Sequence, residues 1–124
     1  MAEDTAGLIE QLWAMFEKQD WDAAADFYAE DAIEEWPQSG ERIRGRDNIM
    51  AINRNYPGFP KSTPRRTLAA GDLVVSEVVL DYDGDIYNSV SVFELKDGKI
   101  VRQTDYFSKP FDAPDWRAQW VEKM

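Results

Sequence analysis

The stretch FELKDGKIVRQTDYFSKPF, residues 93–111, predicts two antiparallel strands joined by a tight turn. Asp97-Gly98 favours a hairpin turn, because both residue types tolerate the positive φ that such turns need. The same dipeptide recurs at Asp83-Gly84, and Gly71-Asp72 marks a third turn. These turns separate four expected strands, at residues 65–70, 73–81, 85–95 and 99–107. The C-terminal half is therefore predicted to be an antiparallel meander.

In the N-terminal half, the apolar residues have the spacing of helices instead. Apolar residues recur three and four positions apart over residues 4–19, which predicts an amphipathic helix capped by Asp4 or Thr5. Asp20 can cap a second, short helix. The remaining expected elements are strands at 32–36 and 42–44, a helix at 47–55, a proline-rich loop at 56–64, and a closing helix at 115–122 that packs Trp116 and Trp120. This order predicts one α+β domain over residues 1–124.

The composition excludes several classes of function. Lys and Arg number 14 and Asp and Glu number 24, so the net charge is −10, which argues against a nucleic-acid partner. The sequence has no Cys and no His, which removes disulfides, thiolate nucleophiles, the commonest metal ligand and the usual general base. The spacing of Asp81, Asp83 and Asp85 does not fit a calcium loop. We therefore expect neither a cofactor nor a metal, and proton chemistry that uses carboxylates, Tyr or Lys.

Nothing in the sequence predicts a membrane partner. No apolar run is long enough to span a bilayer. The acidic, amphipathic first residues, MAEDTAGLIEQL, are unlike a signal peptide. We therefore expect a cytoplasmic protein.

The register of the two long hairpins decides which side chains share a sheet face. Three-residue loops with Gly in the left-handed position would pair Asp81 with Asp85, and would place Ser89 opposite both Glu77 and Asp105. One face would then carry Val75, Glu77, Val79, Tyr87, Ser89, Ser91, Phe93, Val101, Gln103, Asp105 and Phe107. A buried carboxylate without partners costs several kcal/mol, so this mixture predicts a cavity for a polar ligand rather than a plain core. A two-residue turn would shift the register by one residue, and these side chains would no longer share one face.

The opposite face of the predicted sheet is also apolar. It would carry Val74, Val78, Leu80, Val90, Val92, Ile100 and Tyr106. A single sheet with helices on one side leaves its other face in water unless another subunit covers it. We therefore expect a homodimer through the outer sheet face.

Two segments resemble a known superfamily, KQDWDAAADFYAEDAIEEWPQSGERIRG (residues 18–45) and the hairpin stretch 93–111. With the helix start GRDNI and the long meander, the chain resembles the ketosteroid isomerase, SnoaL-like and nuclear transport factor 2-like superfamily. The resemblance implies a cone-shaped α+β barrel, in which a curved, mixed or antiparallel sheet and three N-terminal helices enclose a pocket. Such proteins are often dimers through the outer sheet face. The superfamily includes isomerases, cyclases, epoxide hydrolases, dehydratases and non-catalytic binding modules.

Only some of the family's catalytic residues have a counterpart in this sequence. In ketosteroid isomerases the general-base Asp falls on Trp36 here, and the two oxyanion donors fall on Leu12 and about Ser91, so steroid isomerisation is not expected. The SnoaL-like cyclases place an acid/base Asp in the last strand after a Gly-x-Ile pattern. Gly98-Lys99-Ile100 followed by Asp105 matches that pattern. The partner His of those cyclases, roughly at Ser91, is absent.

Asp105 is the first candidate catalytic residue, as a general acid/base buried in the cone with a raised pKa. The alternative is a structural carboxylate bonded to the backbone. Glu77 is the second candidate, roughly 10 Å away across two strands, and the alternative is a solvated strand residue. Trp36 is expected to form a pocket wall beside Tyr28 and Phe107. The predicted substrate contacts are Trp36, Tyr28, Tyr56, Ser89, Ser91, Gln103 and Phe107.

Two functions follow from these residues. The first is a cofactor-independent acid/base enzyme, catalysing an isomerisation, cyclisation or dehydration of a small apolar or aromatic molecule. The second is a module of the same fold that binds such a ligand, or only dimerises, without turnover. The match at Asp105 favours the enzyme, and the missing His and oxyanion donors favour the binding module.

Overall fold

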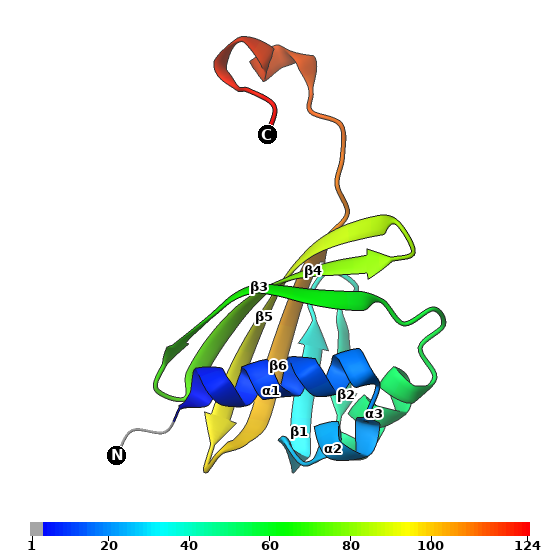
Figure 1. Ribbon diagram of the computed structural model, residues 1–124, viewed down its shortest axis with the longest axis vertical. Helices are drawn as coiled ribbons and strands as arrows, with labels where there is room; N and C mark the ends of the chain where they lie inside the picture. Colours follow the sequence, from blue (N-terminus) through cyan, green and yellow to red (C-terminus); the bar gives the residue numbers. More distant parts are fainter. Residues whose placement is uncertain (1–3) are drawn as a thin grey trace.

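The computed structural model describes residues 4–124. Within them, three α-helices lie on one side of a curved six-stranded sheet that is not closed (Figure 1). The helices are α1 (Thr5–Lys18), α2 (Trp21–Ala25) and α3 (Arg46–Arg54), and a 3-10 helix, η1 (Asp115–Trp120), ends the chain. The strands are β1 (Tyr28–Trp36), β2 (Glu41–Arg44), β3 (Lys61–Ala70), β4 (Leu73–Tyr82), β5 (Asp85–Lys96) and β6 (Lys99–Ser108). The predicted α+β class is confirmed.

The order of the strands brings the two halves of the chain together. The sheet runs β2-β1-β6-β5-β4-β3, with β1 parallel to β6 and the other neighbours antiparallel. The helices cover the concave face, as the predicted cone requires (Figure 1). Strand β3 begins at Lys61, earlier than predicted, because it is an edge strand. An edge tolerates Pro64, whose missing N–H would interrupt a central strand.

The helices form where the sequence predicted them. Asp4 rather than Thr5 caps α1, and its carboxylate accepts a hydrogen bond from the Gly7 N–H at 2.9 Å. Asp20 caps α2 in the same way through Ala23. The inner face of α1 buries Ile9, Leu12, Trp13 and Phe16 against the sheet. Among residues 4–124, no helix is both long enough and apolar enough to span a membrane.

The predicted register of β4 is wrong by one residue. Both hairpins turn over two residues, so Tyr82 pairs with Asp85 and Lys96 with Lys99. Asp83 and Asp97 each take a positive φ, 57° and 52°, before a glycine that also has positive φ. This is the geometry of a two-residue hairpin turn, which Asp-Gly supplies without a third residue. Because strand side chains alternate, the slip exchanges the two faces of β4.

Because the two faces of β4 change places, several predicted positions are wrong. On β4, Val74, Ser76 and Val78 are buried on the concave face, as is Ile100 on β6. The residues now on the outer face are Val75, Glu77 and Val79, which pair with Val92, Val90 and Asn88. Glu77 is half-exposed and forms an ion pair with Arg66. The prediction that Glu77 faces the pocket is therefore wrong.

A β-bulge preserves the predicted faces of β5 and β6. Leu95 pairs with Ile100 but Glu94 pairs with Arg102, so Val101 is an extra residue in β6. The extra residue reverses the alternation once more. Gln103, Asp105 and Phe107 therefore share the concave face with Ser89, Ser91 and Phe93, although Asp105 pairs with Ser91 and not with Ser89.

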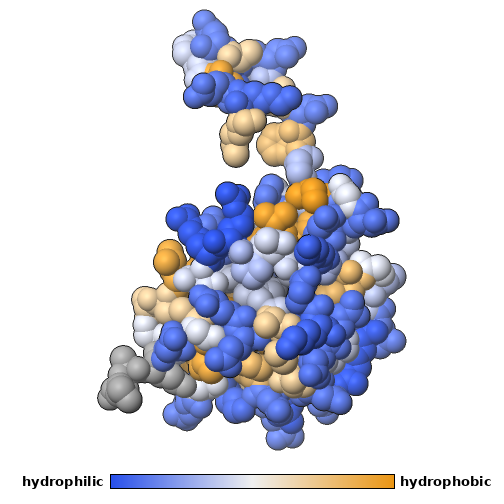
Figure 2. Space-filling view, viewed as in Figure 1, coloured by the Kyte–Doolittle hydropathy of each residue, from blue (hydrophilic) through white to orange (hydrophobic). Residues whose placement is uncertain are grey.

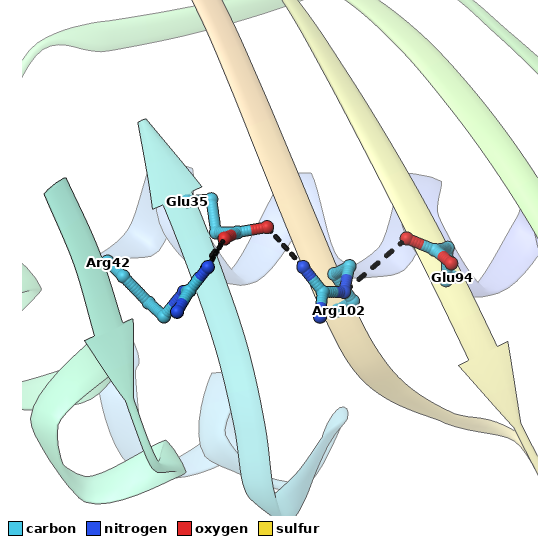
Figure 3. A network of polar contacts seen from close by, with 4 residues as sticks. All are labelled: Glu35, Arg42, Glu94 and Arg102. Carbon is cyan, nitrogen blue, oxygen red and sulfur yellow. Dashed lines mark hydrogen bonds and ion pairs between the residues drawn. The ribbon is translucent and has the colours of Figure 1, made fainter. Parts of the chain in front are cut away.

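An ion-pair network crosses four strands on the outer face (Figure 3). Glu35 of β1 binds Arg42 of β2 at 2.7 Å and also Arg102 of β6, which lies 3.9 Å from Glu94 of β5. Hydrogen bonding from Arg42 is the main cause that lowers the pKa of Glu35. Glu35 and Glu94 of this face are thus paired with arginines.

Candidate functional site

A small cavity lies between the concave face and the helices. Its volume is ≈ 160 Å³. Its walls are mainly aromatic, contributed by Trp13, Phe16, Trp36, Tyr56, Phe59, Tyr82 and Phe107. The polar lining residues are Glu34, Asn53, Ser62, Ser89, Ser91, Gln103 and Asp105, so the lining contains two carboxyl groups and no Lys or Arg.

The two carboxyl groups come from neighbouring strands. Glu34 of β1 pairs with Gln103 of β6, and Asp105 lies two residues further along β6 on the same face. Each residue is only 8% exposed. The indole Nε1–H of Trp36 donates to both groups, at 3.1 Å to Glu34 Oε2 and 3.0 Å to Asp105 Oδ2. One side chain thus holds the two carboxyl groups together at the pocket wall.

Further donors converge on Asp105. Ser91 Oγ donates to Asp105 Oδ1 at 2.7 Å, and Gln103 Nε2 donates to the same oxygen at 2.9 Å. Tyr28 Oη donates to Gln103 Oε1 at 2.5 Å from behind the pocket wall, which turns the amide NH₂ toward the carboxyl groups. Asp105 therefore accepts from three side chains, an arrangement that suits an ionised carboxylate.

Burial acts on the pKa of Glu34. It is the main cause that raises the pKa of Glu34 well above its usual range, followed by the charge of the neighbouring Asp105. The Trp36 hydrogen bond lowers it by less. Burial also raises the pKa of the Tyr28 hydroxyl, so Tyr28 remains a donor. A protonated Glu34 beside Asp105 is the arrangement that two adjacent buried carboxyl groups favour.

Glu34→Gln is expected to flatten the pH dependence of stability. Because the folded pKa of Glu34 lies above its unfolded value of about 4.3, the folded chain holds the proton more tightly. The stability from this proton is complete below the unfolded pKa and is lost as pH rises through the folded pKa. Gln stays neutral throughout. Urea midpoints between about pH 5 and pH 8 measure the slope, which exposed Glu10→Gln should leave at the wild-type value. An unchanged slope in Glu34→Gln would contradict the assignment.

The structure brings most of the predicted site residues together. Asp105, Trp36, Tyr56, Ser89, Ser91, Gln103 and Phe107 all line the cavity. Trp36 packs edge-on against Phe107, with ring centroids 6.4 Å apart. Tyr28, at the start of β1, is fully buried behind Gln103 and does not line the cavity. Glu77 lies on the other side of the sheet, paired with Arg66.

Sequence reasoning missed Glu34 and Tyr82. Alternation along the predicted strand 32–36 already puts Ala32, Glu34 and Trp36 on one face, so the position of Glu34 could have been found. Tyr82 was missed because the predicted three-residue loop between the two strands included it. Its hydroxyl lies 3.0 Å from that of Tyr56 at the pocket wall, and burial raises its pKa. Within residues 4–124, no group of three or more carboxylates comes together that could hold a metal ion.

Comparison with known proteins identifies the family. The model of the SnoaL-like domain family matches residues 9–103. The chain belongs to the SnoaL-like domain family. The resemblance predicted from the sequence is thereby confirmed. No curated protein matches this SnoaL-like chain.

Solved structures show the same fold. An NTF-2 like protein of unknown function from Burkholderia xenovorans LB400 is 40% identical, with 97% of this chain and 94% of that chain covered and a TM-score of 0.86. A "putative ketosteroid isomerase" from Kribbella flavida DSM 17836 is 31% identical, with 99% and 91% covered and a TM-score of 0.93. An LEH-like epoxide hydrolase from M. tuberculosis is 24% identical, with 84% and 82% covered and a TM-score of 0.72, and shares the fold with this SnoaL-like domain.

Proposed function

We propose that this SnoaL-like domain is a cofactor-independent acid/base enzyme acting on a small, uncharged, largely apolar substrate. The observation that carries the proposal is the pair of buried carboxyl groups on the wall of an aromatic cavity. A protonated acid beside an ionised one supplies both partners of a proton transfer without a His. Such a pair can withdraw a proton at one atom of a substrate and deliver one at another.

The proposed chemistry assigns a separate role to each side chain. Asp105 takes a proton from a carbon next to a carbonyl group, or from a water that attacks an epoxide. Glu34 gives its proton to the substrate oxygen as that atom gains negative charge, so the pair keeps one proton throughout. Ser91, Gln103 and Trp36 hold the carboxyl groups in place through their hydrogen bonds to Asp105. These three are positioning residues.

The cavity limits the size and charge of the substrate. Its volume of ≈ 160 Å³ lies below the roughly 300–1,000 Å³ of sites for drug-sized ligands, so the substrate is a small molecule. Two carboxyl groups with no Lys or Arg among the lining residues disfavour an anion. The aromatic walls favour a substrate with apolar surface.

A binding module without turnover is the second candidate. One observation favours it: among the described residues, every buried side-chain N and O atom has a hydrogen-bond partner. Trp36 in particular bonds to both carboxyl groups, so the network is satisfied inside the protein. A network that is complete without a ligand is also what a structural role would produce.

Deuterium exchange distinguishes the two candidates. The protein is incubated in D₂O with a panel of small neutral ketones, and deuterium at the carbon next to the carbonyl is followed by NMR. Small epoxides are assayed in parallel for diol formation, and binding is measured for each compound from the quenching of tryptophan fluorescence. The enzyme proposal expects exchange or hydrolysis that is lost in the Glu34→Gln/Asp105→Asn double variant. Compounds that bind but are never converted would instead support the binding module.

A further inference from the structure

The segment that follows β6, residues 109–124, extends away from the domain, and only Met124 at its end returns to line a groove beside the sheet; we call this segment the C-terminal arm (Figures 1 and 2). Its large apolar side chains are in water: Phe111 is 79% exposed, and Trp116 and Trp120 are each 72% exposed. The predicted packing of Trp116 and Trp120 on their own domain is therefore wrong. Clustered exposed aromatic residues mark an interaction surface.

Two prolines explain why the arm does not fold back. Pro110 follows the end of β6, and Pro114, with φ −71° and ψ 147°, directly precedes η1. Proline fixes φ and disfavours a helical residue before it, so the chain between the two stays extended. Helix η1 then presents Trp116 and Trp120, and the Arg117 guanidinium stacks over the Trp116 ring at 5.8 Å. The chain after β6 therefore extends away from the sheet.

The outer face of the sheet offers a matching apolar surface. Val75, Val79, Val90 and Val92 lie side by side on β4 and β5, and Tyr106 of β6 is 49% exposed beside Val90. A groove of ≈ 580 Å³ runs along this surface at the root of the arm and is lined by Val79, Val90, Tyr106 and Met124, among others. No helix of residues 4–124 covers this face (Figure 1).

We propose that the arm of one chain docks on the outer sheet face of a second copy, whose own arm docks in return. An exchange of this kind uses the same two patches on both chains and closes as a two-fold dimer. From the exposed fractions, the three aromatic side chains present roughly 350–550 Å² per arm. Two arms and the surfaces they cover then bury roughly 1,400–2,200 Å², the size of a stable interface.

The local charges of the arm fit the outer sheet face. The chain carries a net charge of −10, so two copies repel one another over most of their surface. On the outer face, Glu35 and Glu77 are paired with arginines, and Arg65 lines the groove. The arm carries Asp112 and Asp115 on either side of its second proline. Docking would bring these carboxylates to the arginine-bearing face, the region where the two copies repel least.

Light scattering at micromolar concentration tests the exchange on the full-length chain. The wild type is expected to give twice the monomer mass of 14.3 kDa, and the Trp116→Ala/Trp120→Ala variant a monomer. Val90→Lys, on the receiving face, is expected to give a monomer as well. Exposed Gln11→Ala on α1 is the control and should remain a dimer. The arm contributes no buried residue, so its variants should remain folded. Circular dichroism checks the folding of every variant.

Tryptophan fluorescence provides a second test of the same proposal. In a dimer with docked arms, iodide should quench wild-type emission less at high protein concentration than after dilution to the monomer. The arm variant should show no such concentration dependence. A monomeric wild type would overturn the proposal, and so would a dimer that survives the loss of Trp116 and Trp120, since that dimer would form without the arms. The proposal does not depend on the acid/base function.

Discussion

Asp105→Asn is expected to lower the turnover of any substrate that the pocket converts by about 10²-fold or more, the usual scale for a lost general acid or base. The amide cannot accept the substrate proton. It does keep an oxygen for the hydrogen bond from Ser91, which holds the carboxylate at 2.7 Å in the wild type. The new NH₂ group faces the Trp36 N–H, which keeps its bond to Glu34, so circular dichroism checks that the variant folds. The kcat measured under substrate saturation then reports the chemical step.

The neighbouring position supplies a matched control. Thr104 is the residue before Asp105 on β6, and pairs with Val92 on the outer face. Thr104→Ala changes the same strand without touching the cavity, so it should keep kcat within about twofold of the wild type. Wild-type turnover in Asp105→Asn would remove Asp105 from the mechanism and leave the binding module as the better explanation.

Phe93→Ala is expected to destabilise the domain by about 3–5 kcal/mol, the usual cost of truncating a fully buried phenylalanine. Phe93 is fully buried on the concave face, and its ring meets that of Trp13 of α1 edge-on, with centroids 6.1 Å apart. The substitution removes apolar contacts and leaves a cavity between helix and sheet. Urea unfolding, at a protein concentration low enough for a monomer, measures the loss.

Phe111→Ala is the same substitution at an exposed position. Its effect on monomer stability should lie within about 0.5 kcal/mol. If Phe93→Ala were equally mild, the contact between Phe93 and Trp13 would not be part of the stabilising core.

The sequence contains the positions of the turns but not their lengths. Asp83-Gly84 and Asp97-Gly98 place both hairpins correctly, yet the same dipeptide fits a two-residue turn or part of a three-residue loop. The bulge at Val101 has no local signal. On β6, the bulge reverses the alternation again and Asp105 returns to the predicted face, whereas β4 has no bulge and Glu77 moves to the outside.

The candidate site was predictable where it depends on alternation alone. Ser91 reaches the cavity in agreement with its predicted face, whereas Gln103 does so because the bulge at Val101 offsets the shorter turn. Glu34 was accessible to the same argument, but its meeting with Asp105 depends on the parallel pairing of β1 with β6, which no local pattern encodes. The exposed position of Trp116 and Trp120 was missed, because their helical spacing is equally typical of a helix that packs on its own domain.

The parallel pairing of β1 with β6 also sets the order in which the site is assembled during synthesis. Trp36 and Asp105 meet across 69 positions of sequence. A nascent chain that ends at the Asp97-Gly98 turn already contains the helices and five of the six strands, but it lacks Gln103 and Asp105. Contacts between distant segments form only when the last of them is available. Glu34 therefore has neither Gln103 nor Asp105 beside it until β6 leaves the ribosome, and no chain that ends before β6 holds the two carboxyl groups together.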